Sequence, residues 1–255
     1  MSSLLLLTDG PDVTADLLRQ AAMGLGFDTR VVELGRDRVT LRIGASVSIE
    51  CDGEVLAPDV VINRCSANPS GLPSVASLNR QSVGSWSGRF AAAREEQGLL
   101  LAVLDAWEAL GVTVVNPPAV EARALMDNWF ALRMAREGVG LGRRVDETVA
   151  VVDGRGAQRP DQETLNLEAR RICQLVATVT GARLCEVDLE IADDGACRPV
   201  AWRPGVDLLA HGDGAALAGP ILAHLLGAVA RDVSVVSPDL FVEDLITNLE
   251  APPNG

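Results

Sequence analysis

Lysine and tyrosine are both absent from this sequence, so all 22 of its basic residues are arginines. Aromatic residues make up only 3% of the chain, the formal net charge is −13, and the pI is about 4.6. The arginines form no basic stripe along the sequence. Nucleic acids and anionic membranes both attract clustered basic side chains, so the composition argues against both as partners.

Residues suited to metal binding or nucleophilic catalysis are also scarce. His211 and His224 are the only histidines, which argues against a His-based metal site or a Ser-His-Asp triad. The five cysteines contain no Cys-x-x-Cys pair and show no secretory context. We therefore expect reduced, mostly buried thiols rather than a disulfide framework or a zinc site.

Long apolar runs are missing as well. No segment is long enough to span a bilayer, and Leu4–Leu7 is too short, and lacks the basic start, for a signal peptide. We therefore expect a cytoplasmic protein. The hydrophobic content is nevertheless 48% and the mean hydropathy is +0.20, which is high for an acidic monomer. This predicts a protein partner or self-association that covers apolar surface.

The spacing of the apolar residues indicates an α/β fold. In the amino-terminal half the apolar spacing predicts helices at 13–24 and 89–110, strands at 3–7, 29–34, 60–62 and 112–115, a hairpin pair within 38–51, and a long loop at 68–88. The first strand, helix and strand form a βαβ unit, which predicts a parallel sheet. In the carboxy-terminal half we expect strands at 148–152, 184–191 and 197–202 and helices at 165–180 and 215–229.

The stretch 111–138 joins the two halves. It begins as a buried strand, stops at Asn116-Pro117-Pro118, where prolines remove backbone donors, and resumes as a helix from about Val120.

The order of these elements resembles the amino-terminal half of ATP-grasp carboxylate–amine ligases, closest to the branch of ribosomal-protein-modifying glutamate ligases. In that branch a hairpin precedes D-x-V-I-x-R, and a G-x-x-V-x-N-x-P-x-A-I segment leads into a helix that opens with D-K. The positions that match are Asp59, Ile62, Arg64, Gly111, Val114, Asn116, Pro118, Ala119 and Asp127; Asn128 stands where the family has Lys.

The carboxy-terminal half resembles the same family over LNLEARRICQLVATVTGARLCEVDLEIADDGACRPVAWRPGVDL. Asp188 falls on the family's first metal-binding carboxylate, and Pro204 on the proline after its Glu-x-Asn pair. The resemblance implies an ATP-grasp-like α/β fold: a parallel-sheet pre-ATP-grasp domain at 1–118, a reduced ATP-grasp core at 119–231 and a tail at 232–255.

Several parts of the family's machinery have no counterpart here. The central subdomain that covers the nucleotide is missing, because Gly142 leads almost directly into the strand 148–152. No lysine is available for the phosphates, and Arg does not replace a strand Lys like for like. Counting forward from Asp188 places the family's Glu and Asn near Pro199 and Ala201, or one residue later at Val200 and Trp202, so no second metal-binding carboxylate is found.

The candidate binding residues follow from the sheet and the resemblance. Arg64 ends a parallel strand, where such sheets bind ligands, and Asn116 ends another strand of that sheet. Ser85, Trp86 and Arg89 form a candidate binding loop. Asp188 is a vestigial metal ligand, or else a solvated or capping Asp beside a turn, the usual exposed setting for this residue.

Three functions remain open at this stage. The first is a non-catalytic partner or scaffold subunit that works with a full ATP-grasp ligase or as a homo-oligomer, with no cofactor. The second is an active ATP- and Mg²⁺-dependent carboxylate–amine ligase with a minimal or shared site built from Arg64, Arg143, Arg144 and Asp188. The third is a small-molecule or peptide binding module near Arg64 and the loop at 85–89.

Overall fold

The computed structural model describes residues 2–8, 10–34, 37–43, 47–65, 98, 100–124, 126, 128–157, 165–212 and 214–227. The expected loop at 68–88, the first part of the predicted helix 89–110, Asp127 and the tail at 232–255 lie outside these ranges. None of the helices within them is both long and apolar enough to cross a membrane.

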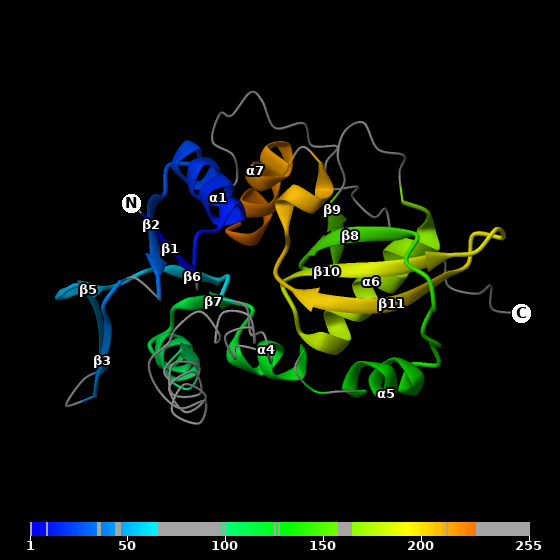
Figure 1. The fold of residues 1–255 in the computed structure, drawn as a ribbon, viewed down its shortest axis with the longest axis horizontal. Coiled ribbons are helices and arrows are strands. Elements are labelled where there is room, and N and C mark those ends of the chain that lie inside the picture. The colour runs from blue at the N-terminus through cyan, green and yellow to red at the C-terminus, as the bar shows by residue number, and fades with distance from the viewer. Residues whose placement is uncertain are drawn as a thin grey trace, which may run out of the picture.

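The amino-terminal part is built on a parallel sheet, as the sequence predicted (Figure 1). Its strands, in the order β2-β1-β6-β7, are β2 (Asp28–Glu33), β1 (Ser3–Thr8), β6 (Val60–Asn63) and β7 (Thr113–Val115). Leu4 and Leu6 pack on one side, and Leu5 and Leu7 on the other. The unbroken apolar run of the first strand therefore reflects a sheet that is buried on both faces.

Two helical layers cover this sheet. Helix α1 (Val13–Gly24) and helix α7 (Gly214–Leu225) pack on the face of Leu4 and Leu6, although nearly the whole chain separates them. The helix at 100–109 covers the other face with Leu104 and Trp107. Helix α7 thus completes the core of the amino-terminal sheet.

The predicted hairpin pair is a three-stranded antiparallel sheet that projects from the end of the parallel sheet (Figure 1). It consists of β3 (Val39–Ile43), β4 (Val47–Cys51) and β5 (Glu54–Leu56). Asp52 and Gly53 turn between β4 and β5 with φ of 53° and 86°. Two consecutive positive φ angles are the mark of a type I′ hairpin, for which Asp-Gly is a favoured pair.

The second large sheet is antiparallel, with the order β11-β10-β8-β9. Its strands are β8 (Glu147–Val152), β9 (Arg155–Ala157), β10 (Leu184–Ile191) and β11 (Cys197–Pro204). Helix α6 (Leu167–Thr180) covers one face, against Cys185, Val187 and Leu189 of β10. The alternate residues of β10 therefore point to the opposite face, which carries the candidate site.

The helix expected from about Val120 is two helices, which corrects the prediction. Helix α4 spans Pro118–Ala124 and helix α5 spans Trp129–Arg136. Asn128 adopts a left-handed conformation with φ 60° between them, and a residue in that conformation interrupts a right-handed helix.

Asn116 joins the two large sheets. It is 1% exposed and left-handed, with φ 58°. Its Nδ2 donates to the Leu184 carbonyl at 2.6 Å, and its Oδ1 accepts from the Leu184 amide at 3.2 Å. The side chain thus forms two hydrogen bonds with the first residue of β10 and holds it at the carboxyl end of β7. The domain boundary proposed near residue 118 stays a prediction.

Replacing Asn116 with alanine is expected to lower the free energy of unfolding by about 2–3 kcal/mol, because the Leu184 amide and carbonyl lose buried partners. Alanine is also less tolerant than asparagine of positive φ. Denaturant unfolding at pH 7 measures the loss. Asn116→Gly relieves the backbone without restoring the hydrogen bonds, so its loss should be smaller but still present; stability equal to the wild type in both variants would contradict the role of this joint.

Candidate functional site

Two acidic side chains lie on the face of β10 opposite helix α6. Glu186 and Asp188 alternate with core residues, and only 4% and 6% of their surfaces are exposed. Asp188 is therefore a buried residue inside a strand, not a solvated or capping Asp beside a turn, which corrects that expectation. Glu186 was missed, although the alternation of Glu186, Asp188 and Glu190 in the sequence is the signal that places acids on one face of a strand.

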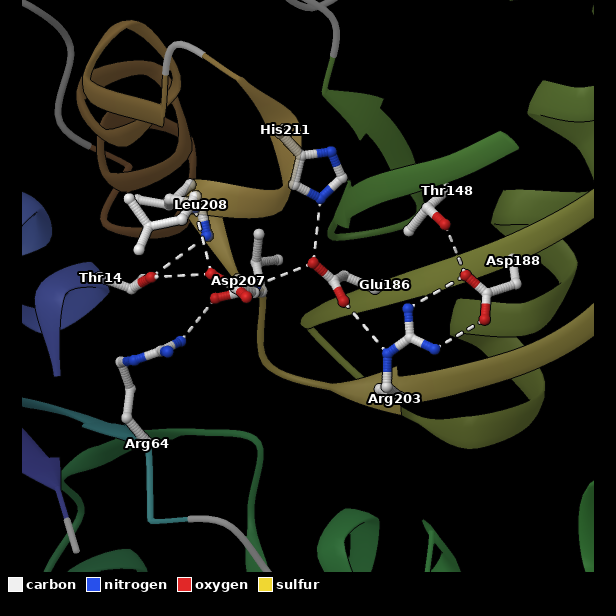
Figure 2. A network of polar contacts seen from close by, with 11 residues as sticks. Thr14, Arg64, Thr148, Glu186, Asp188, Arg203, Asp207, Leu208 and His211 are labelled. Carbon is white, nitrogen blue, oxygen red and sulfur yellow. Dashed lines mark hydrogen bonds and ion pairs between the residues drawn. The ribbon is translucent and has the colours of Figure 1, made fainter. Parts of the chain in front are cut away.

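The guanidinium of Arg203 on β11 binds both carboxylates (Figure 2). Nη1 lies 2.6 Å from Asp188 Oδ2, Nη2 lies 3.0 Å from Asp188 Oδ1, and Nε lies 3.2 Å from Glu186 Oε2. The hydroxyl of Thr148 also donates to Asp188 Oδ1 at 2.7 Å. Burial alone would raise the pKa of Asp188, but Arg203 and Thr148 stabilise its ionised form and hold the pKa below its ordinary value.

Glu186 carries this network on to the 3-10 helix η1 (Leu208–His211). Its Oε1 accepts from the Asp207 amide at 2.8 Å and lies 3.0 Å from His211 Nε2. Burial opposes ionisation, yet these contacts together with Arg203 lower the pKa of Glu186. Both acids are thus ionised at neutral pH, and neighbouring groups compensate their charge.

Arg64 extends the network to the parallel sheet. Its Nε lies 2.6 Å from Asp12 Oδ2, and its Nη1 donates to the Val206 carbonyl at 2.6 Å. Asp12 also caps α1 by accepting from the Ala15 amide. Figure 2 shows the polar contacts that run from the side of Arg64 to Asp188. These contacts connect the two sheets, and the role of Arg64 as a ligand contact stays a prediction.

The other predicted site residues fall in different settings. Ser85, Trp86 and Arg89 lie outside the described residues. Asn116 uses its amide to hold Leu184, as described above. Arg143 is exposed, and Arg144 pairs with Asp146 at 2.7 Å. Their assignment to a ligand stays a prediction.

The residues around Asp188 do not fit a magnesium site. Asp188 pairs across the sheet with Ala201, which offers no side-chain oxygen, and Arg203 fills the space in front of the carboxylate. Mg²⁺ requires several oxygen ligands, and a guanidinium at hydrogen-bonding distance opposes a second cation by charge. Among the described residues there is no group of three or more His, Cys, Asp or Glu side chains that could hold a metal ion.

Comparison with solved structures identifies the architecture. The structure of the ATP-grasp ligase PsnB complexed with minimal precursor, Mg and ADP matches with a TM-score of 0.67 and 16% identity over 88% of this chain and 96% of that chain. The chain has the fold of the ATP-grasp ligases. This agrees with the family resemblance of the sequence, whereas the loss of a subdomain stays a proposal.

Two further structures share the ATP-grasp fold. The macrocyclase MdnC of Microcystis aeruginosa MRC, bound with precursor peptide MdnA, gives a TM-score of 0.63 at 10% identity over 88% of this chain and 99% of that chain. A RiPP-associated ATP-grasp ligase of Chryseobacterium gregarium, in complex with ADP and a leader and core peptide, gives 0.63 at 9% over 92% and 100%. No family model and no curated protein matches the sequence.

Proposed function

We propose that this chain is an ATP-grasp-fold protein that binds a peptide or protein partner and does not itself activate a carboxylate with ATP. The observation that carries the proposal is the bidentate pair between Arg203 and Asp188. The family resemblance implies that Asp188 would bind a metal ion. Here the guanidinium of Arg203 binds this carboxylate instead and neutralises its charge.

An arginine in place of a metal ion at Asp188 would remove a requirement of ATP-grasp ligase chemistry. Attack of a carboxylate on the γ-phosphate needs several negative charges of ATP to be neutralised, which Mg²⁺ and cationic side chains supply. This chain has no lysine. Only a few residues separate Gly142 from β8, which begins at Glu147, and this short link supports the proposed loss of the nucleotide-covering subdomain.

A peptide or protein is the class of partner that we propose. The MdnC and Chryseobacterium gregarium structures contain bound peptides, and this supports peptide binding as a function that this chain could retain without ligase activity. An oligomer or a complex with a full ATP-grasp ligase would bury the surface that the missing subdomain leaves uncovered.

A second candidate is an ATP-dependent carboxylate–amine (peptide) ligase. Its support is that PsnB and the Chryseobacterium gregarium protein, whose structures contain ADP, are ATP-grasp ligases. Such an enzyme would use Asp188 with Arg64, Arg143 and Arg144 and complete its site with another chain. Arg203 would first have to release Asp188, which costs free energy because the carboxylate is buried.

An ADP-release assay separates the two candidates. The protein is incubated with Mg-ATP and candidate acidic peptides, alone and mixed with a full-length ATP-grasp ligase. The proposal predicts no ADP above background from the protein alone. Release that Asp188→Asn abolishes and that the exposed-site control Arg198→Ala retains would establish the ligase instead.

A further inference from the structure

One face of helix α5 points away from the core, and the helix lies at the edge of the molecule in Figure 1. Met134 is fully buried and Phe130 packs on the same core, so these two side chains mark the inner face. With 3.6 residues per turn, Leu132 lies on the opposite side, and it is 67% exposed. Together with its neighbours at helical spacing it forms the α5 outer face: Trp129, Leu132, Arg133 and Arg136.

The basic charge of the α5 outer face has no internal partner. Neither the Arg133 nor the Arg136 guanidinium makes an ion pair or hydrogen bond in the part of the chain that the structure describes. Arg123 of α4 adds a third guanidinium, 5.9 Å from the centre of the Trp129 ring. Glu121 of α4 does not compensate these cations, because it is 3% exposed and burial raises the pKa of its carboxyl to about 7. On a chain with a net charge of −13, this face favours an acidic partner.

The same surface also exposes apolar side chains. Met126, whose carbonyl accepts from the Trp129 amide at 3.2 Å, is 55% exposed, next to a helix on which Leu132 is more exposed still. A segment that covers this surface must therefore bring apolar side chains for Trp129 and Leu132 and acidic side chains for the arginines. An amphipathic acidic helix has both, and such helices bind by laying their apolar face on an apolar surface.

The carboxy-terminal segment 238–250 carries this complementary pattern in its sequence, although it lies outside the described residues. Ser237, Pro238 and Asp239 form a helix-start signal. Apolar residues then recur at helical spacing, which predicts an amphipathic helix: Phe241, Val242, Leu245, Ile246 and Leu249. The residues 232–255 include five acids and no basic residue: Asp232, Asp239, Glu243, Asp244 and Glu250.

A short series of contacts links the end of α7 to the α5 outer face. The Leu225 carbonyl of α7 accepts from Arg183 Nη2 at 3.0 Å. Thr180, three residues before Arg183, accepts from Arg123 Nη1 at 2.6 Å, and three residues span at most about 11 Å. The thirteen residues from Leu225 to Pro238 can span roughly 45 Å. The segment 238–250 can therefore reach the α5 outer face of its own chain.

We propose that the segment 238–250 docks on the α5 outer face of the same chain as an amphipathic helix, with its apolar stripe on Trp129 and Leu132 and its acids beside Arg133 and Arg136. A short tether supplies an effective concentration of about 1 mM. A dissociation constant of about 0.1 mM for the free segment would thus leave the face occupied about ten times more often than open. The docking needs no nucleotide, metal or precursor peptide, so it goes beyond both candidate functions.

Hydrogen exchange followed by mass spectrometry on the full chain, at pH 7 and low ionic strength, tests the proposal. A free helix of this length is marginal in water, so a synthetic 237–250 peptide gives the unprotected rate. In the wild type, the amides of 241–249 should exchange about tenfold more slowly than in that peptide. Arg133→Glu/Arg136→Glu should remove this protection, because the acids of the segment then face acids.

A charge exchange guards against misfolding of α5. The reversal Glu243→Arg/Asp244→Arg leaves α5 untouched and should also remove the protection, and combining both reversals should restore it. Arg19→Glu/Arg171→Glu changes the net charge equally at exposed positions of α1 and α6 and should leave the protection as in the wild type.

Three results would overturn the proposal. The first is exchange of 241–249 in the wild type at the rate of the free peptide. The second is protection that survives both single reversals or that the Arg19→Glu/Arg171→Glu control removes equally. The third is protection that disappears on dilution, which would place the segment on a second copy of the chain.

Discussion

Arg203→Ala is expected to destabilise the protein by about 2–3 kcal/mol at pH 7, because it leaves two buried carboxylates without their shared cation. The expected loss lies at or just below the roughly 3–5 kcal/mol typical of a broken buried pair, since half of the Arg203 side chain is exposed while Asp188 and Glu186 are almost fully buried. Chemical denaturation at pH 7 measures the difference.

The pH dependence of this loss has a definite sign. The folded-state pKa values of Asp188 and Glu186 are lowered, so the stability they contribute is present above their unfolded pKa values and is lost as the pH falls through the folded ones. The difference between Arg203→Ala and the wild type should therefore shrink in acid. Arg198→Ala, at an exposed position of the same strand, is the control; an equal effect of the two variants would contradict the structural role of Arg203.

Glu121→Gln is expected to stabilise the protein by about 3 kcal/mol at pH 8. The folded-state pKa is raised from 4.5 to about 7, so the folded protein favours the protonated carboxyl. The resulting penalty is absent below pH 4.5, grows between pH 4.5 and 7, and is complete above pH 7. Glutamine is permanently uncharged and removes that penalty.

Unfolding curves collected from pH 4 to pH 8 check this prediction. The stabilities of Glu121→Gln and the wild type should converge at the acid end and separate above pH 7. Glu108→Gln, at an exposed position of the helix 100–109, should show no such separation. A constant difference between Glu121→Gln and the wild type at all pH values would exclude titration of Glu121 as the cause.

The parts of the fold that were predictable are those in which one local pattern decides the structure. The apolar run Leu4–Leu7 required a sheet covered on both faces, and Asp52-Gly53 required a tight hairpin turn. The division between α4 and α5 was not predictable, because it depends on the left-handed backbone of Asn128, which helical spacing of apolar residues does not report.

The site was harder to predict because a bulge shifts the pairing of β10 and β11. Leu189 pairs with Pro199, but Asp188 pairs with Ala201, so Val200 is the extra residue and the register moves by one. Counting along the sequence considered Pro199 to Trp202 as positions of the family's Glu and Asn and did not reach Arg203. The shift brings Arg203 opposite Glu186, from which its guanidinium binds both acids.

Metal binding shows whether Arg203 replaces a metal ion at Asp188. The measurement is Mg²⁺ titration by calorimetry, repeated with Mn²⁺ by electron paramagnetic resonance, on the wild type and on an Ala201→Glu/Arg203→Asn variant, which removes the guanidinium and places side-chain oxygens opposite Asp188 and Glu186. We expect no specific binding to the wild type and saturable binding to the variant, which the further substitution Asp188→Asn should abolish. Saturable binding to the wild type that Asp188→Asn abolishes would mean that Arg203 does not replace the metal.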